Sequence, residues 1–237
     1  MRELTPIDYQ HDGVTMHGLL ALPDGPGPHP AIMVMYSALG MDDLVRNRTR
    51  EFADMGYVAL ATDIYGDQDD PFFTLQGNPQ LLRDRVLAGY HVLCHMSEVD
   101  KNRIAAIGYC FGGQCVLELA RSGADVRAVV SFHGLLKTGL PARPGAVKAG
   151  ILVLTGALDP YAPLSDVAIF QQEMIDAKAD WHLTVYGNGK HAFTERDIME
   201  RADPSKVQMD GLAYDPLLDK LSWSQALAFI DALISKP

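Results

Sequence analysis

The sequence predicts an α/β fold with a mostly parallel central sheet, helices on both of its faces and a β-hairpin at the N-terminus. Short apolar runs alternate with segments that carry apolar residues at helical spacing, which is the pattern of parallel strands joined by crossover helices. Near the start of the chain, Asp12-Gly13 lies between two strand-like runs, and this pair favours a hairpin turn.

The expected elements follow in order after a loop rich in proline and glycine at 23–30. Strands are expected at 31–35, 57–62, 104–107, 126–132, 151–155 and 181–186, and helices at 42–55, roughly 79–97, 111–121, 165–178 and 223–234. Ala31–Met35 reads AIMVM, the continuous apolar run of a strand buried on both faces. Gly56 falls where a helix C-terminal glycine belongs. No repeat or long linker interrupts the series, so we expect one domain over residues 1–237.

The composition excludes several classes of protein. With 48% hydrophobic and 21% charged residues, the chain has ample material for a globular core. Its net charge of −10 comes without a basic run, which disfavours binding to nucleic acid. No stretch approaches the roughly 18 apolar residues of a membrane helix, and the N-terminus lacks the apolar core of a secretory signal. An odd count of three cysteines does not indicate a disulfide framework, so we expect a reduced, cytoplasmic protein.

The clearest chemical motif lies at 104–113, which reads IAAIGYCFGG and is followed by the helical run QCVLELA. A strand, then Gly-x-Cys-x-Gly-Gly, then a helix is the context of the nucleophile elbow of α/β-hydrolases, with Cys110 as the nucleophile. The glycines permit a strained turn, and the helix N-terminus favours a thiolate and leaves the Phe111 N–H to bind an oxyanion. An isolated cysteine is more often a buried structural residue, but glycines at these offsets favour the nucleophile.

A cysteine nucleophile needs a base and a group that orients the base, and in α/β-hydrolases the acid precedes the histidine along the chain. Asp159 follows the strand expected at 151–155, and His191 lies in a glycine-rich loop after the strand expected at 181–186. Alone, Asp159 is better explained by an Asp-Pro turn, and His191 is explained equally well by a polar loop position. Their order and their places at strand ends favour Asp159 as the acid and His191 as the base. His133 also ends a strand, and we expect it to line the pocket.

Together these segments resemble the dienelactone hydrolase family over essentially the whole chain. The likeness covers the N-terminal hairpin, the TDIYG, GYCFGG, GALDP and KHAF motifs, and a C-terminal helix that contains tryptophan. It implies an α/β-hydrolase fold, a Cys110, Asp159 and His191 triad, and oxyanion N–H groups from Phe111 and Ala38. We expect no metal or organic cofactor, since no ligand cluster has zinc-like spacing.

Two positions depart from the pattern of this family. Its founding enzymes carry a glutamate that contacts the thiol, where this sequence has Ser37. They also bind a substrate carboxylate with two arginines, one of them four residues after the histidine, where this sequence has Glu195. Arg83 or Arg85 is the candidate for the other arginine. We expect Ser37, Leu39, His133 and Glu195 to line the substrate pocket, and the departures put a carboxylated lactone substrate in doubt.

The sequence therefore predicts hydrolysis of a small ester or lactone through a thioester on Cys110. One alternative is a true dienelactone hydrolase (carboxymethylenebutenolidase) that acts on carboxylated lactones. Another is a non-catalytic protein of the same fold that binds a ligand or senses oxidants through Cys110. The expected partner is the small-molecule substrate, with no nucleic acid or membrane, and the expected state is a monomer or small homo-oligomer.

Overall fold

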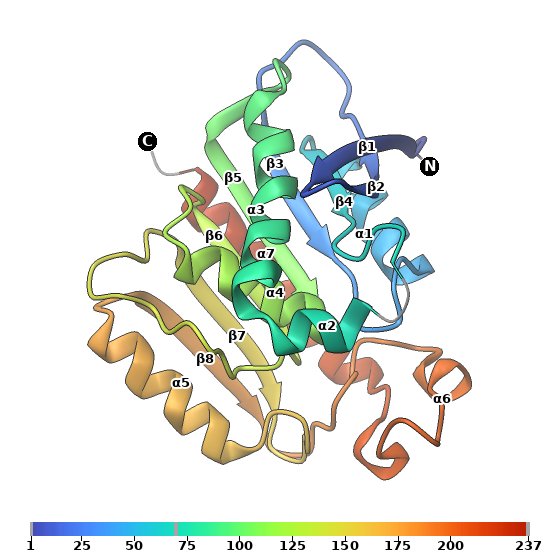
Figure 1. Ribbon diagram of the computed structural model, residues 1–237, viewed down its shortest axis with the longest axis vertical. Helices are drawn as coiled ribbons and strands as arrows, with labels where there is room; N and C mark the ends of the chain where they lie inside the picture. Colours follow the sequence, from blue (N-terminus) through green and yellow to red (C-terminus); the bar gives the residue numbers. More distant parts are fainter. Residues whose placement is uncertain (1, 69–70, 236–237) are drawn as a thin grey trace.

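The computed structural model describes residues 2–68 and 71–235, in which one eight-stranded sheet has the order β1-β2-β4-β3-β5-β6-β7-β8 (Figure 1). β1 pairs antiparallel with β2, and β2 pairs antiparallel with β4. Every other neighbouring pair is parallel. The predicted α/β fold with its N-terminal hairpin is confirmed.

The described elements have these bounds. The strands are β1 (Thr5–His11), β2 (Val14–Ala21), β3 (His29–Met35), β4 (Val58–Thr62), β5 (Val99–Tyr109), β6 (Ala128–Phe132), β7 (Gly150–Gly156) and β8 (Asp180–Tyr186). The helices are α1 (Asp43–Asp54), α2 (Pro71–Gly77), α3 (Pro79–His95), α4 (Phe111–Arg121), α5 (Leu164–Asp176), α6 (Ile198–Arg201) and α7 (Pro216–Ile234), with a short 3₁₀ helix at Met209–Gly211.

Local sequence explains the hairpin and the central strands. Asp12 and Gly13 join β1 to β2 with φ of 48° and 78°, a left-handed turn that suits these two residue types. The AIMVM run of β3 is fully buried, because helices cover the sheet on both sides of it.

Helices form one layer on each face of the sheet (Figure 1). α3 and α4 pack against each other and against the central strands on one face. α1 and α7 cover the opposite face, where the rings of Phe52 and Trp223 meet edge to face with centroids 5.4 Å apart. Apolar residues from both layers and from the sheet form the main core.

Several boundaries differ from those predicted. β5 begins at Val99 rather than at 104, and α7 begins at Pro216 rather than at 223. Asp215 caps α7 by accepting hydrogen bonds from the backbone N–H groups of Leu217 and Leu218 at 2.9 and 3.1 Å, and proline suits the first helical position. α2 and α6 were not predicted, because they are too short to show a helical period.

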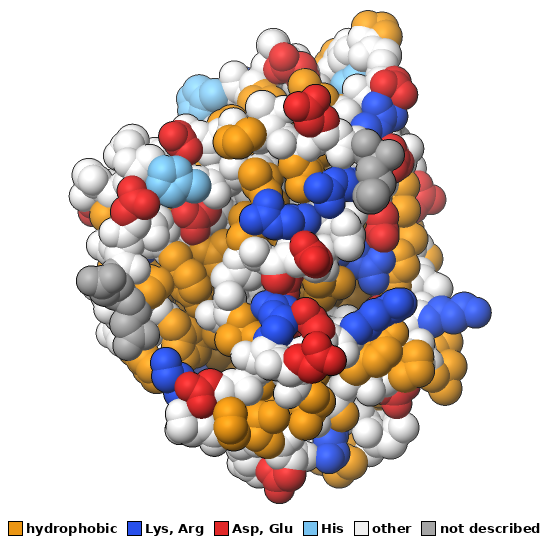
Figure 2. Space-filling model, turned by 90° about the vertical axis from the view of Figure 1, so that its right-hand side faces the viewer, with side chains coloured by type: hydrophobic (Ala, Val, Ile, Leu, Met, Phe, Trp, Pro, Cys, Tyr) orange, Lys and Arg blue, Asp and Glu red, His pale blue; other side chains and the backbone are white. Residues whose placement is uncertain are grey.

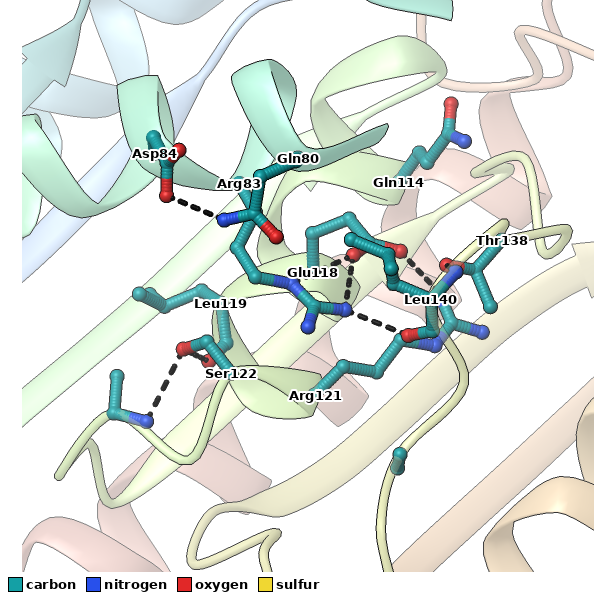
Figure 3. Close-up of polar contacts among 12 residues, drawn as sticks. Gln80, Arg83, Asp84, Gln114, Glu118, Leu119, Arg121, Ser122, Thr138 and Leu140 are labelled. Carbon is teal, nitrogen blue, oxygen red and sulfur yellow. Dashed lines mark hydrogen bonds and ion pairs between the residues drawn. The ribbon is translucent and has the colours of Figure 1, made fainter. Parts of the chain in front are cut away.

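Buried charges tie α4 to its neighbours (Figure 3). Glu118 of α4 accepts from Arg83 of α3 at 2.7 Å and pairs with Arg121 at 3.1 Å. Arg121 also binds Glu173 of α5 at 2.8 Å and donates to the carbonyl of Leu136 at 2.8 Å. This network fixes the loop after β6 against α4.

The outer surface shown in Figure 2 carries acidic and basic side chains interspersed with hydrophobic ones. Among residues 2–68 and 71–235, no helix is long and apolar enough to cross a membrane. The parallel strands end at one edge of the sheet, where the chain from 187 to 215, including α6, lies beyond them (Figure 1). In parallel α/β sheets this edge is where ligands bind.

Candidate active site

Cys110 forms the turn between β5 and α4, and it is the single residue between them. Its backbone has φ 52° and ψ −113°, a conformation that side-chain-bearing residues rarely adopt. Cys110 N donates to Phe132 O at 3.0 Å, which ties the turn to β6. Such strain is characteristic of functional turns. The thiol therefore sits at the N-terminus of α4, beside N–H groups that have no partner within the helix.

The glycines around this turn are required by close backbone contacts. A Cβ on Gly108 would lie 2.0 Å from the carbonyl oxygen of Gly112. A Cβ on Gly112 would lie 2.3 Å from Met35 O and 2.6 Å from Tyr36 O. The start of α4 thus packs directly against the end of β3, which brings the loop with Ser37 and Ala38 next to Cys110.

His191 is held by Asp159 and by its own backbone. Its Nδ1 lies 2.8 Å from Asp159 Oδ2, and both side chains are almost completely buried. The other carboxylate oxygen, Oδ1, accepts from the backbone N–H groups of Tyr161 and Ala162 at 2.8 and 3.2 Å. His191 N donates to Gly211 O at 3.0 Å, and His191 O accepts from Ala213 N at 3.1 Å. Nδ1 faces the carboxylate, so Nε2 is the nitrogen left for Cys110.

The electrostatics of this group favour a charged imidazole. Burial by itself would lower the pKa of His191. The negative charge of Cys110 and hydrogen bonds to Asp159 and Cys110 outweigh burial, so that the pKa lies well above its usual value. A negative charge at Cys110 thus stabilises the imidazolium form of His191.

Cys110 and His191 open into one pocket of about 410 Å³. Its walls are mainly apolar: Ala38, Leu39, Phe72, Phe73, Leu135, Ala192, Ile198, Ala202, Val207 and Leu212. The remaining lining side chains are Ser37, Tyr161, Glu195, Asp203 and Lys206. Much of the wall comes from the chain beyond His191, which packs as a small separate hydrophobic cluster.

The structure brings three of the four expected pocket residues to the wall. Ser37, Leu39 and Glu195 line it. Ser37 Oγ accepts weakly from Leu39 N at 3.4 Å and carries no charge. Ala38 also lines the pocket, and its carbonyl accepts from Tyr65 Oη at 3.1 Å, which fixes the loop.

His133 does not line the pocket, and here the expectation is corrected. Its ring is fully buried, and Nε2 lies 2.7 Å from the Thr194 hydroxyl. It packs against the ring of His191, with centroids 5.2 Å apart. Burial and the nearby His191 charge lower the pKa of His133 well below its usual value. His133 is therefore a neutral ring that packs against His191.

The two arginines considered for a substrate carboxylate are engaged elsewhere. Arg83 binds Glu118. Arg85 is buried, and it donates to the carbonyls of Ile64 and Tyr65 and to Gln68. Neither arginine lines the pocket. Within the described ranges, no group of three or more His, Cys, Asp or Glu side chains could hold a metal ion.

Sequence reasoning missed the far wall of the pocket. Phe72 and Phe73 belong to the unpredicted helix α2, and Ile198 belongs to the unpredicted α6. Tyr161 lines the pocket through its ring, which packs against His191 with centroids 4.8 Å apart. The one signal available was its place two residues after Asp159, at the same strand end.

The fold and this arrangement of an elbow, a histidine and a carboxylate define an α/β-hydrolase. The sequence profile of the Dienelactone hydrolase family matches residues 16–234. The chain belongs to the dienelactone hydrolase family and is a hydrolase of that type, as the sequence motifs predicted.

Known proteins are similar along nearly the full length. A Bradyrhizobium protein described as a "Probable 2-oxo-3-(5-oxofuran-2-ylidene)propanoate lactonase" is 27% identical over 244 residues, covering 94% of this chain and 92% of that protein. The solved structure "m3DLH" is 35% identical with a TM-score of 0.86, covering 98% of this chain and 99% of that one. A dienelactone hydrolase-like promiscuous phosphotriesterase, P91, from metagenomic libraries is 31% identical with a TM-score of 0.84, covering 98% of each chain.

Proposed function

We propose that this protein hydrolyses small, uncharged carboxylic esters or lactones through a thioester on Cys110, with His191 as acid and base and Asp159 as its orienting group. One observation carries the proposal. Cys110 on its strained turn and His191 share one pocket, and Asp159 binds the histidine nitrogen that faces away from the thiol.

The reaction follows from these positions. The Cys110 Sγ forms a bond to the carbonyl carbon of the ester, and the carbonyl oxygen takes up the displaced electron pair. The N–H groups of Phe111 and Ala38 stabilise this oxyanion. When the intermediate collapses, the C–O bond breaks and the leaving alcohol takes a proton from His191.

Deacylation uses the same groups. A water molecule gives a proton to His191 and bonds to the thioester carbon, and the C–S bond then breaks. The carboxylic acid leaves, and Cys110 and His191 return to their starting charges. Asp159 keeps its charge throughout and favours the imidazolium form of His191.

The character of the pocket supports an uncharged substrate over the carboxylated lactones of a true dienelactone hydrolase. The walls near Cys110 are apolar apart from Ser37 and Glu195. The cation that lines the pocket, Lys206, is exposed and lies next to Asp203 in the wall, so its charge is largely screened.

The test is a panel of short-chain esters, neutral lactones and carboxylated lactones with the parent protein and Cys110→Ala. We expect turnover of the neutral substrates and a loss of at least about a thousandfold in Cys110→Ala. Reaction of Cys110 with peroxide, measured beside turnover, addresses the sensor alternative. Rapid oxidation without turnover of any ester or lactone would contradict the proposal and favour a sensor.

A further inference from the structure

Glu195 is a carboxyl group buried in the wall of the pocket. Its side chain is 1% exposed, yet the residue lines the pocket that holds Cys110 and His191. Its Oε2 accepts no hydrogen bond from any residue that the structure describes. A buried carboxylate oxygen without a hydrogen bond is costly, so such a group is either protonated or reserved for a ligand.

The nearby arginine does not satisfy this carboxyl. Arg201 of α6 is closest to other acids, with Nη1 2.6 Å from Asp42 and 3.3 Å from Asp197. Its Nη1 lies 3.9 Å from Glu195 Oε2, which makes a long ion pair but no hydrogen bond. Asp42 stands before α1 and fixes Arg201 there. The carboxyl of Glu195 therefore remains available to the pocket.

The charged groups around Glu195 act in opposite directions. Burial is the largest influence and raises its pKa; His191 and Arg201 lower the pKa, whereas Asp42 and Asp197 raise it further. The result is a pKa of about 7. Asp203 and Lys206 carry opposite charges and line the same pocket as exposed residues. Near neutral pH, both the acid and the carboxylate forms of Glu195 are populated.

We propose that Glu195 determines substrate specificity: as a carboxylate it accepts a hydrogen bond from a hydroxyl or N–H group of an uncharged substrate and excludes a substrate that carries a carboxylate. This inference rests on the proposed function, since it assigns the substrate class of the same site. When Glu195 is protonated, the repulsion disappears and the acid can donate a hydrogen bond to a substrate carboxylate. Selectivity for neutral substrates therefore rises as the pH rises through about 7.

The experiment compares two esters of the same alcohol, phenyl butyrate and monophenyl glutarate, which differ in a terminal carboxylate. The value of kcat/KM is measured for each from pH 5.5 to 8.5. Effects of pH on the bond-breaking step itself are shared by both esters, so they cancel in the ratio of the two values. The glutarate carboxylate stays ionised over this range, since its pKa is near that of a free carboxylic acid, about 4.3.

In the parent protein, the ratio of kcat/KM for the neutral ester over the charged ester is expected to rise about ten- to a hundredfold with pH. In Glu195→Gln, which has nearly the same shape and no charge, the ratio is expected to be low and independent of pH. Glu200→Gln is the matched control, because Glu200 is an exposed acid close by that does not line the pocket. This control is expected to behave as the parent does.

Each outcome decides the proposal. A ratio that does not change with pH in the parent protein overturns it, as does an unchanged pH dependence in Glu195→Gln. If Glu195→Gln does not fold, two measurements on the parent protein decide instead. One is the change with pH in the ratio of the two kcat/KM values. The other is inhibition by butanol and by butyrate at pH 6 and pH 8, in which inhibition by butyrate must be weaker at pH 8 and inhibition by butanol must not. Absence of turnover with both esters would contradict the proposed function itself. That result is distinguishable from failure of the Glu195 proposal, in which both esters are turned over.

Discussion

The ring of His133 stands edge-on to the ring of His191, with centroids 5.2 Å apart and an interplanar angle of 70°. One ring is held neutral by burial and the other is held charged by Cys110 and Asp159. The pKa values of two adjacent histidines are therefore shifted in opposite directions. These opposite shifts allow His191 to keep a proton without a second positive charge beside it.

The first prediction concerns stability in acid. The unfolded chain protonates His133 at about pH 6.5, whereas the folded protein does so only at lower pH. Below about 6.5 the unfolded state thus binds more protons at this site, so stability falls as the pH falls. We test this with His133→Asn, since asparagine tolerates the positive φ at this position. In this variant the free energy of unfolding should depend less on pH, by up to about 1.4 kcal/mol per pH unit. Urea unfolding between pH 5 and 7.5 measures this pH dependence. His95→Asn, at an exposed histidine, is the control. Parallel curves for the parent and His133→Asn would contradict the assignment.

The second prediction concerns the thiol and Ser37. Iodoacetamide at pH 7 should label Cys110 before Cys94 or Cys115, and burial raises the pKa of Cys115 well above its usual value. Ser37→Glu puts a carboxylate into the pocket wall beside the thiol, which disfavours the thiolate. We expect labelling of Cys110 to slow about tenfold or more, measured by peptide mass spectrometry. Ser97→Glu, at an exposed serine, should leave the rate unchanged. Equal rates in all three proteins would show that Ser37 does not influence the thiol.

The third prediction concerns the elbow. In Gly112→Ala the new methyl group meets the carbonyl oxygens of Met35 and Tyr36, so the start of α4 must move. We expect a loss of about 1–3 kcal/mol in the free energy of unfolding, together with a large loss of activity. Gly187→Ala is the control, because a Cβ there meets nothing within 4 Å, and it should change stability by no more than about 0.5 kcal/mol. Thermal unfolding beside an esterase assay separates the two effects.

The fourth prediction concerns the buried charges of α4. Glu118→Gln removes the anion between Arg121, whose side chain is buried, and Arg83, whose side chain is partly buried. Arg121 keeps its partner Glu173, but Arg83 loses its carboxylate partner, so we expect a loss of about 1–3 kcal/mol in stability. Glu98→Gln, at an exposed glutamate, should cost little. A loss below about 1 kcal/mol in Glu118→Gln would show that the arginines find other partners.

Much of the fold was predictable because it depends on local sequence patterns. The alternation of strands and helices and the Asp12-Gly13 turn required no long-range information. The elbow was equally local, since its glycines and Cys110 are adjacent in sequence. These features are dictated by backbone sterics at single positions.

The rest depended on contacts between distant segments. The sequence cannot show that Asp42, far away along the chain, holds Arg201. As a result, Glu195 Oε2 has no hydrogen bond although it lies in a buried wall. Nor can it show that His133 is buried against His191 and lies outside the pocket wall. Both histidines follow strands that end at the same edge of the sheet, so the sequence places them alike. Helices α2 and α6 are too short for periodicity, so the wall they supply was missed.

The central claim is a thioester on Cys110, and trapping the acyl-enzyme tests it most directly. The protein is mixed with an activated acetate ester, quenched in acid within milliseconds, and examined by intact-mass and peptide mass spectrometry. The account predicts one acetyl group per chain, on the peptide that contains Cys110, released by hydroxylamine and absent from Cys110→Ala. An acetyl group on another residue, or full turnover by Cys110→Ala, would contradict it.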